Sequence, residues 1–378
     1  MQVPFARPYL TGEEPAAVGA AIASGWISQG PRVRAFEEAF AARVGAREAV
    51  ATTNCTTALH LALHALGVGP GDEVVVPSLS FIATANAVWH CGASPVFADV
   101  DPATLNLDPV AAERAITPRT KAIMPVHQVG LPADMDRFLE LGRRHGIAVV
   151  EDAACALGAV YKDRPVGSLG SLACFSLHPR KVITTGEGGM ITVNEPGLAE
   201  RLRRLRAHAM DLSDLARHNA REVLIERYPE RGFNMRMTDM QAALGLCQLK
   251  ALDVILARRR RLAERYTAAL RGIPGIEPPQ DPIYARRTWQ SYCVRVRPSA
   301  GIGRTQLMRR LLVDGIQTRR GVMAIHREPA YAEAEIALVH TERAADEMLM
   351  LPLFPDLSEE AQDYVIDRLA AHALARAA

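Results

Sequence analysis

The strongest constraint on the fold is an alternation of short apolar segments with helix-length segments between residues 13 and 250. We predict six strands in this stretch, at 73–76, 95–99, 122–126, 147–150, 172–176 and 190–193. Strands that alternate with helices favour a mostly parallel sheet with helices on both faces. The sequence therefore predicts an α/β fold for this part of the chain.

A Pro- and Gly-rich segment at 273–279 marks a boundary after a long helix that we expect at 248–270. Beyond it, the pattern predicts a strand at 290–296 and helices at 305–314, 342–350 and 358–371, which together indicate an α+β unit. We therefore divide the chain into a large domain, 13–250, and a smaller C-terminal α+β domain, 251–378. Residues 1–12 form an N-terminal arm. At 378 residues the chain has room for two domains with a substantial core.

One segment interrupts the alternation of strands and helices. Residues 210–232 are polar and rich in Arg and His, and they separate a helix expected at 199–208 from one that begins near Thr238. A long irregular segment in a compact domain is typically functional or disordered. The sequence leaves both interpretations open.

Two ionisable residues are expected at the carboxyl-terminal edge of the sheet, where open α/β sheets bind ligands. Asp152 follows the predicted strand 147–150, and Lys181 lies between an apolar run and a glycine-rich turn at 184–190. A lysine amine can form a Schiff base, and a carboxylate that faces the ring nitrogen of pyridoxal phosphate keeps that nitrogen protonated. Taken singly, Lys181 fits a surface lysine and Asp152 fits a helix cap. Together they predict a pyridoxal phosphate site.

A phosphate-binding helix start is expected at Thr53-Asn54-Cys55-Thr56-Thr57, which precedes the helical apolar pattern of 58–66. Helix N-termini bind phosphate through free N–H groups and the helix dipole. The hydroxyls of Thr56 and Thr57 can add hydrogen bonds to the same oxygens. Ordinary N-capping by threonine is the alternative for this segment taken alone.

Composition excludes several other classes of protein. The 44 Lys and Arg residues nearly balance the 42 Asp and Glu residues, so no nucleic-acid surface is indicated. The six cysteines are scattered, with no CxxC pair and no His/Cys cluster of metal spacing, so we expect reduced, packed thiols and no metal site. The N-terminus lacks the pattern of a signal peptide, and no apolar run reaches membrane-spanning length. We expect a soluble, cytoplasmic protein without a membrane partner.

The order of short motifs resembles that of the DegT/DnrJ/EryC1/StrS family of sugar aminotransferases. The similar blocks cover nearly the whole chain: SGW at 24–26, GP at 30–31, ALH at 58–60, PS at 77–78, TANA at 84–87, DVD at 99–101, PADM at 132–135, EDAA at 151–154, FS at 175–176, GEGG at 186–189, GFN at 232–234 and RMTD at 236–239. The resemblance implies the type I pyridoxal phosphate transferase fold, as in aspartate aminotransferase. It also implies transfer of an amino group from glutamate or glutamine to a keto-sugar that is most often nucleotide-linked.

The resemblance also assigns residues. It makes Lys181 the Schiff-base lysine and Asp152 the partner of the pyridine nitrogen. Thr56, Thr57 and Ser176 are expected at the cofactor phosphate, and Phe81 is expected to stack on the cofactor ring, with a core phenylalanine as the alternative.

The resemblance further implies a homodimer with shared active sites. Asn234 is expected to reach the partner subunit's cofactor phosphate, with Arg236 as the nearby alternative. Part of the irregular stretch 210–236 is expected to reach across with Asn234. The alternative to a shared site is a loop that folds back on its own subunit, with Asn234 capping the helix near Thr238.

The sequence departs from the family pattern at two places. Cys155 stands where Gln or His is common, near the phenolic oxygen of the cofactor, and a thiol is a weak hydrogen-bond donor. His178 matches a frequent histidine, but Pro179 and Arg180 after it are less usual. We expect Cys155 to contact the cofactor and His178 to support the site from beside it or to contact the substrate.

Substrate contacts are expected from the smaller domain, in the segment 318–326. Arg319 suits a diphosphate or an α-carboxylate through its bidentate guanidinium, and His326 ends the segment. Two alternative functions remain: a pyridoxal phosphate-dependent sugar dehydratase, which in related enzymes has histidine in place of the lysine, and a non-catalytic member that senses a sugar. Lys181 argues against the first, and the retained lysine, aspartate and phosphate site argue against the second.

Overall fold

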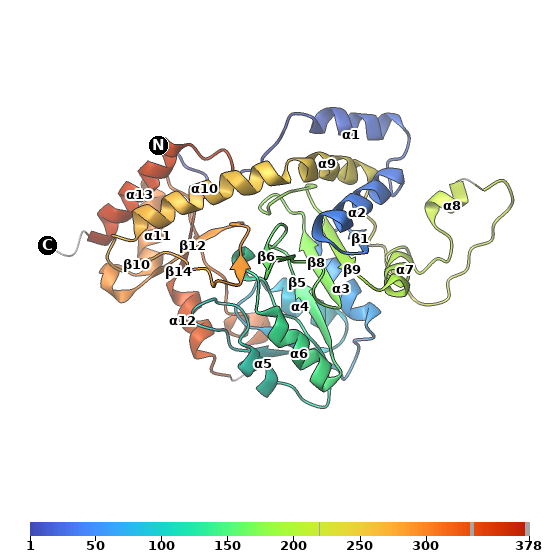
Figure 1. The fold of residues 1–378 in the computed structure, drawn as a ribbon, viewed down its shortest axis with the longest axis horizontal. Helices are drawn as coiled ribbons and strands as arrows, with labels where there is room; N and C mark the ends of the chain where they lie inside the picture. Colours follow the sequence, from blue (N-terminus) through green and yellow to red (C-terminus); the bar gives the residue numbers. More distant parts are fainter. Residues whose placement is uncertain (219, 333–335, 375–378) are drawn as a thin grey trace.

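The computed structural model describes residues 1–218, 220–332 and 336–374 (Figure 1). Within them, the central sheet has seven strands: β1 (Glu48–Thr52), β2 (Glu73–Pro77), β3 (Ser94–Ala98), β4 (Thr120–Ile123), β5 (Ala148–Asp152), β8 (Leu172–Ser176) and β9 (Gly189–Val193). Their order is β1-β9-β8-β5-β4-β2-β3, parallel from β3 to β8 and antiparallel on both sides of β9. The predicted α/β fold with a mostly parallel sheet is confirmed.

Several helices cover the two faces of this sheet, and others belong to the C-terminal part or to a projecting segment. The helices of the described residues are α1 (Glu14–Ala23), α2 (Pro31–Val44), α3 (Cys55–Ala65), α4 (Ala83–His90), α5 (Pro109–Arg114), α6 (Met135–His145), α7 (Pro196–Leu205), α8 (Asp214–His218), α9 (Asp239–Lys250), α10 (Leu252–Leu270), α11 (Arg304–Val313), α12 (Val339–Glu347) and α13 (Glu359–Leu374). Short 3-10 turns lie at Gln128–Gly130, Pro298–Ala300, Ile325–Arg327 and Pro329–Tyr331. Helices α3, α4 and α7 contribute to the hydrophobic cluster on one face, and α2, α5, α6 and the start of α10 contribute to the cluster on the other.

The strand β2 shows why the sheet is covered on both sides. Val74 and Val76 pack into the cluster that includes α3, whereas Val75 packs into the opposite cluster. Successive side chains of a strand point to opposite faces, so a strand that is apolar at every position needs a helix layer above and below it. The uninterrupted valine run therefore specifies the three-layer arrangement.

A second, antiparallel sheet lies in the C-terminal part of the chain. Its strands are β10 (Ile276–Glu277), β12 (Tyr292–Val296), β13 (Arg319–Arg320) and β14 (Met348–Leu351), in the order β10-β12-β14-β13. A separate hydrophobic cluster joins this sheet to α11, α13 and the second half of α10. A third small sheet pairs β11 (Ala285–Arg286) and β7 (Arg164–Pro165) with the strand between them, β6 (Val160–Tyr161).

The N-terminus belongs to the same cluster as the second sheet. Val3 is buried in that cluster, its N–H donates to the Gly315 carbonyl at 2.9 Å, and its carbonyl accepts from the Gln317 N–H at 3.0 Å. Helix α10 contributes Ile255 to a cluster of the central sheet and Tyr266 to the C-terminal cluster. The division into domains 13–250 and 251–378 remains our interpretation, and its residues 333–335 and 375–378 lie outside the described part.

Two predicted elements need correction. The helix expected at 342–350 ends at Glu347, and Met348–Leu351 is instead the strand β14. Its apolar residues continue a helical pattern, but β14 lies between β12 and β13, and the backbone bonds of the sheet fix the strand. The helix expected at 248–270 is the end of α9 followed by α10, with a bend of 57° between the two helices.

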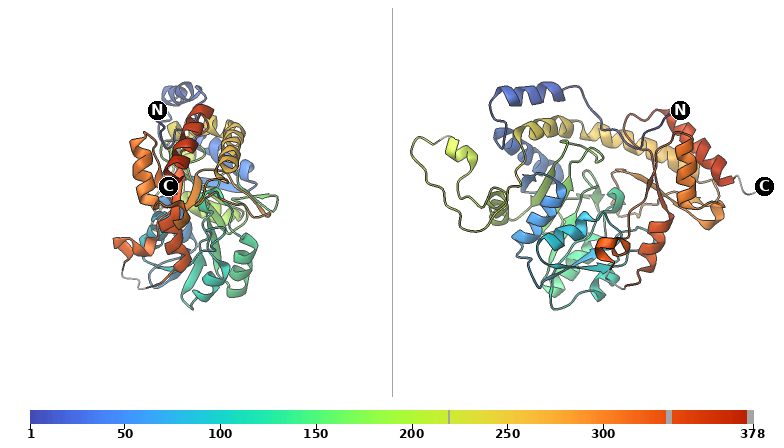
Figure 2. Two further views of the ribbon diagram at one scale, coloured as in Figure 1. Left: turned by 90° about the vertical axis from the view of Figure 1, so that its left-hand side faces the viewer. Right: turned by 180° about the vertical axis from the view of Figure 1, so that it is seen from behind.

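The irregular segment 210–232 stands away from the body of the molecule and carries α8, although residue 219 within it lies outside the described residues (Figures 1 and 2). A hydrogen bond joins the first and last parts of this segment, in which the Asp211 N–H donates to the Arg227 carbonyl at 3.0 Å. Large aliphatic side chains of this segment are exposed, including Val223 (91%) and Ile225 (82%). Exposed apolar groups on a projecting segment mark a surface suited to contact with another chain.

Among the described helices, none is by itself both long and apolar enough to cross a membrane. Helices α9 and α10 reach the required length and composition only as a pair, and that pair is bent.

The start of α2 depends on a carboxylate from another helix. Asp239, the first residue of α9, is fully buried and accepts from the N–H groups of Gly30 (2.9 Å), Arg32 (3.1 Å) and Val33 (2.9 Å). These are free N–H groups at the N-terminus of α2, which has Gly30 at its N-cap and no capping side chain of its own. Asp239 therefore attaches α2 to α9.

We predict that Asp239→Ala lowers the free energy of unfolding by about 3 kcal/mol, because buried N–H groups lose a charged acceptor. Asp239→Asn, which keeps one acceptor oxygen, should lose less. Denaturant unfolding followed by circular dichroism measures both. The matched control is Asp253→Ala in α10, since Asp253 is 82% exposed and pairs only with Arg43 at the surface. Equal losses at 239 and 253 would contradict the capping role.

Candidate active site

Asp152 and Lys181 come together at the carboxyl-terminal edge of the central sheet. Asp152 ends β5, and Lys181 lies in the turn that follows the neighbouring strand β8. That turn is closed by two hydrogen bonds, from the Leu177 N–H to the Gly188 carbonyl and from the Thr185 N–H to the Leu177 carbonyl, both at 2.9 Å. The returning strand β9 begins at Gly189, so the lysine turn is anchored at both ends by the sheet.

A close backbone approach brings the start of α3 against the same turn. A Cβ atom at Gly189 would overlap the carbonyl oxygen of Asn54, and Asn54 is the N-cap of α3. Only a residue without a side chain fits there. Gly189 therefore lets the N-terminus of α3 lie beside β9 and the lysine turn.

The carboxylate of Asp152 is buried and hydrogen-bonded. Its Oδ2 accepts from the Thr84 hydroxyl at 2.8 Å and its Oδ1 accepts from the Ala154 N–H at 3.2 Å. Burial raises the pKa of Asp152, and these two hydrogen bonds with the charges of Lys181 and His127 only partly offset that effect. The site thus holds a desolvated carboxylate that gains from a nearby positive charge.

Lys181 faces the thiol of Cys155. Its Nζ donates to Cys155 Sγ at 3.2 Å. Burial lowers the pKa of Lys181, but the charge and hydrogen bond of Cys155, with further contributions from Cys55 and Asp152, more than offset burial and raise it. The amine is therefore held in its charged form, with a proton acceptor at hydrogen-bond distance.

The buried residue before Asp152 secures the end of β5. Glu151 Oε2 lies 3.0 Å from His127 Nε2, and Oε1 accepts from the N–H groups of Leu169 (3.1 Å) and Gly170 (2.7 Å). Because His127 Nδ1 accepts from the Ala133 N–H at 3.0 Å, Nε2 is the nitrogen that donates to Glu151. Glu151 thus connects β5 by hydrogen bonds to the segment that carries His127 and to the segment that precedes β8.

The start of α3 uses its two predicted threonines differently. Asn54 and Thr57 form a capping box: Asn54 Oδ1 accepts from the Thr57 N–H at 2.9 Å, and Thr57 Oγ1 accepts from the Asn54 N–H at 3.2 Å. The Thr57 hydroxyl also donates to the Asn54 carbonyl at 2.7 Å. The Thr56 hydroxyl makes no hydrogen bond within the described part of the chain. Thr56 is therefore the hydroxyl available to a ligand, and Thr57 is committed to the cap.

Phe81 and Ser176 also lie at this edge of the sheet. Phe81 precedes α4 in the segment that follows β2, and it is 59% exposed, so the alternative of a core phenylalanine is wrong. Ser176 ends β8 and pairs with Gly189 across the sheet. His178 follows in the lysine turn, where its Nδ1 accepts from the Arg180 N–H at 3.2 Å; burial is the largest cause of its lowered pKa.

Two further predicted residues, Asn234 and Arg319, make contacts with other parts of the chain. Asn234 is exposed and forms a β-bridge with Ala207 beside the projecting segment. It does not cap α9, because Thr238 and Gln241 form the capping box of that helix. Arg319 lies in β13, with its guanidinium carbon 5.4 Å from the ring centre of Phe5 in the N-terminal arm.

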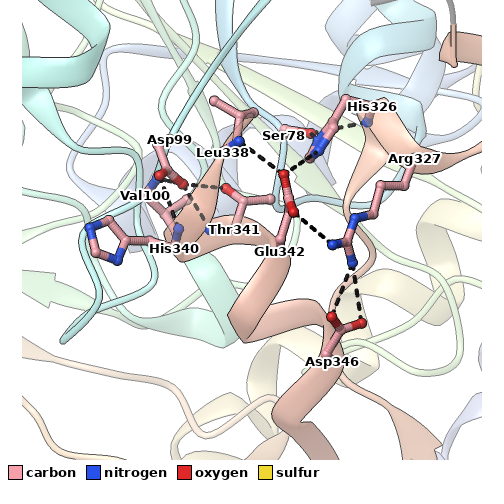
Figure 3. A network of polar contacts seen from close by, with 10 residues as sticks. All are labelled: Ser78, Asp99, Val100, His326, Arg327, Leu338, His340, Thr341, Glu342 and Asp346. Atoms are coloured by element: carbon pink, nitrogen blue, oxygen red, sulfur yellow. Dashed lines mark hydrogen bonds and ion pairs between the residues drawn. The ribbon is translucent and has the colours of Figure 1, made fainter. Parts of the chain in front are cut away.

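His326 is buried in the polar network of Figure 3. Its Nδ1 lies 2.7 Å from Ser78 Oγ, and its Nε2 lies 3.4 Å from Glu342 Oε1. Glu342 in turn accepts from Arg327 at 2.7 Å. These contacts hold α12 against the segment after β2, and a substrate role of His326 stays a prediction.

Sequence reasoning missed Thr84, Glu151 and His127 as parts of the site. Thr84 was noted only as part of the TANA block at 84–87. No pattern in the neighbouring sequence indicated that its hydroxyl donates to Asp152, which is 68 residues away in the chain. Two cavities, of about 680 and 450 Å³, lie elsewhere, along α2 and between residues 24–29 and Arg236.

Comparison with known proteins gives consistent matches over the full length. The model of the DegT/DnrJ/EryC1/StrS aminotransferase family matches residues 8–370. GDP-perosamine synthase of Caulobacter vibrioides is 44% identical and covers 97% of both chains. The spore coat polysaccharide biosynthesis protein SpsC of Bacillus subtilis is 42% identical over 97% of this chain and 95% of its own. The crystal structure of the aminotransferase TlmJ of Streptoalloteichus hindustanus is 37% identical, with a TM-score of 0.92 and full coverage of both chains.

With its parallel sheet, its strand-end carboxylate and its lysine turn, the protein is an aminotransferase. The chain belongs to the DegT/DnrJ/EryC1/StrS aminotransferase family, whose homologues are sugar aminotransferases.

The contacts of Asp152 predict the effect of Thr84→Val. The Thr84 hydroxyl lowers the pKa of Asp152, so its loss should raise that pKa further above its ordinary value of 3.8. The resulting loss of stability is present above the raised folded pKa and disappears below 3.8, where the carboxyl is protonated in both states. A carbon-13 NMR titration of labelled aspartate, together with unfolding at several pH values, measures both effects.

The matched control is Thr104→Val, which removes a hydroxyl that donates to Asp101 Oδ1 at 2.9 Å. It should leave the titration of Asp152 unchanged. An Asp152 midpoint that stays constant or falls in Thr84→Val would contradict the assigned contact.

Proposed function

We propose that this aminotransferase uses pyridoxal 5'-phosphate to move an amino group from glutamate or glutamine to a nucleotide-linked keto-sugar, in amino-sugar biosynthesis. The observation that carries the proposal is the pair of the half-buried Lys181, in the turn after β8, and the buried Asp152, at the end of β5, beside the N-terminus of α3. Aminotransferases of this family depend on pyridoxal phosphate. The relative GDP-perosamine synthase, by its name, makes a nucleotide-linked sugar.

The residues present fit this cofactor. Its phosphate suits the free N–H groups of α3, to which Thr56 adds a free hydroxyl and Ser176 a nearby one. Its ring nitrogen, when protonated, suits the Asp152 carboxylate, because hydrogen bonds and neighbouring charges only partly offset the cost of burying that carboxylate. Its ring face suits the exposed Phe81, since an aromatic ring left in solvent gains by stacking.

The cofactor, when bound, supplies an electron sink that stabilises negative charge on the substrate carbon. The chain's own residues supply the proton transfers. Cys155 Sγ, 3.2 Å from Lys181 Nζ, can take the proton that must leave the ammonium before the amine acts as a nucleophile. Asp152, fixed by Thr84 and Ala154, would hold a proton on the ring nitrogen of the cofactor.

Lys181 favours aminotransfer over dehydration. A mobile primary amine can both hold the cofactor and carry a proton between two carbon atoms, whereas an imidazole at that position cannot form the covalent bond. Retention of the buried Asp152 also argues against a sensor without catalysis. A buried carboxylate with a raised pKa lowers the stability of the protein, and such groups are typical of catalytic sites.

We further propose a homodimer in which Asn234 reaches the partner subunit's site. The supporting features are the exposed side chain of Asn234 and the projecting segment, whose aliphatic groups Val223 and Ile225 face solvent in one subunit. Twofold association is the commonest geometry for identical chains. Arg319 remains a candidate for an anionic part of the substrate, since its guanidinium is on the surface.

Borohydride reduction of the purified protein should fix a pyridoxyl group on Lys181, as mapped by peptide mass. Incubation with glutamate before reduction should prevent the adduct, because aminotransfer leaves the lysine free. Lys181→Ala should give no adduct and retain the fold, and Lys162→Ala, at an exposed lysine paired with Asp136, is the control that keeps it. An adduct on Lys162 or Lys121 in the unmodified chain would refute the assignment.

Mixed dimers test the shared site. A dimer of Lys181→Ala with Asn234→Asp should have one intact site of two if Asn234 acts on the partner subunit, because the negative charge of the substitution repels phosphate only in the other site. The reciprocal control pairs the double variant with the unmodified chain, and it should be inactive. Active reciprocal dimers and inactive mixed dimers would show instead that each site uses one chain. Different affinity tags on the two chains allow verified heterodimers to be purified.

A further inference from the structure

Cys155 differs from the other cysteines of the chain. All six lie within the described residues; five are buried, whereas Cys155 is partly exposed. The pKa of each of the other five thiols is raised, with burial as the largest cause. The thiolate is the reactive form of cysteine, so burial protects those five from oxidation. A small oxidant can reach Cys155 more easily than any of them.

Cys155 is also held against an amine. Lys181 Nζ donates to Cys155 Sγ at 3.2 Å, so the nitrogen and the sulfur are in direct contact. The backbone of Cys155 is fixed, because its carbonyl accepts from the Thr288 hydroxyl at 2.8 Å and Thr288 donates in turn to the Gly130 carbonyl at 3.1 Å. The Cα atom from which the thiol extends is therefore held in place next to the lysine turn. An oxidised sulfur at this position would already lie next to a primary amine.

We propose that hydrogen peroxide joins Cys155 to Lys181 through a reversible sulfur–nitrogen bond. In the first step the thiolate attacks one peroxide oxygen, the oxygen–oxygen bond breaks, and the products are a sulfenic acid and hydroxide. In the second step Lys181 nitrogen attacks the sulfur. The ammonium gives one proton to the leaving hydroxyl, which departs as water, and a second proton neutralises the hydroxide of the first step.

The overall reaction is balanced. One thiolate, one ammonium and one peroxide give one sulfur–nitrogen bond and two waters. Sulfur is oxidised by two electrons and the peroxide is reduced by two. A thiol reductant reverses the bond by attack on the sulfur, which returns the thiol and the amine.

The consequence for activity rests on the proposed function. A lysine whose nitrogen is bonded to sulfur cannot hold pyridoxal phosphate, so oxidation would prevent the cofactor-free protein from binding the cofactor covalently. Conversely, a lysine already bonded to the cofactor cannot attack the sulfur. The sulfur–nitrogen bond would therefore form in the cofactor-free protein and not in the protein that holds the cofactor.

Mass spectrometry of the full-length protein tests the bond directly. After brief peroxide treatment, the cofactor-free protein should become lighter by two hydrogens, and digestion should yield one joined peptide that contains Cys155 and Lys181. Dithiothreitol should restore the original mass. Protein loaded with pyridoxal phosphate should form much less of the joined peptide. This readout does not use catalysis, so the joined peptide would still form if the proposed cofactor chemistry were wrong.

Matched variants separate this bond from other products. Cys155→Ser and Lys181→Arg should each abolish the joined peptide, because the first removes the sulfur and the second replaces the nucleophilic amine with a guanidinium. Cys247→Ser, at a buried thiol of α9, should leave it unchanged. A disulfide between Cys155 and Cys55, which also loses two hydrogens, would overturn the proposal. So would a Cys155 that gains oxygen while Lys181 stays free.

Discussion

The approach of β9 to the start of α3 is the constraint on which the site depends. Gly189 permits the Asn54 carbonyl to lie against the strand, and the same strand closes the turn that carries Lys181. One backbone contact thus sets the distance between a helix N-terminus, which attracts an anion, and an amine, which attacks a carbonyl. With a side chain at 189, both groups would remain, but their relative position would change.

The C-terminal part of the chain reaches the same site through buried polar contacts. The segment after β2, which carries Phe81 and leads to Thr84, is held by the contact of Ser78 with His326 and by a β-bridge between Leu79 and Ala324. Glu342 and Arg327 connect that segment to α12 (Figure 3). The ring that we expect to stack on the cofactor is therefore positioned by residues from both halves of the chain.

The sequence was sufficient for the elements whose pattern is set locally. We could place β2, β5, β8, β9 and the Lys181 turn from the sequence. Short apolar runs indicate buried strands and glycines indicate turns, and both patterns extend over only a few residues. The strand β14 could not, because its partners β12 and β13 are distant in sequence and override a helical pattern. Thr84 was missed for the same reason: its role exists only when α4 lies beside the end of β5. The commitment of Thr57 to a capping box likewise depends on side-chain orientation rather than on residue type.

The placement of Val3 has a consequence for synthesis of the chain. Its partners, Gly315 and Gln317, lie in the last quarter of the sequence, and Phe5 contacts Arg319 in the same region. A chain that emerges from the ribosome N-terminus first must therefore keep these first residues unpaired while the central sheet forms. Residues 3–5 therefore complete their contacts only after residues 315–319 have been made, and the apolar surface around Val3 stays open until then.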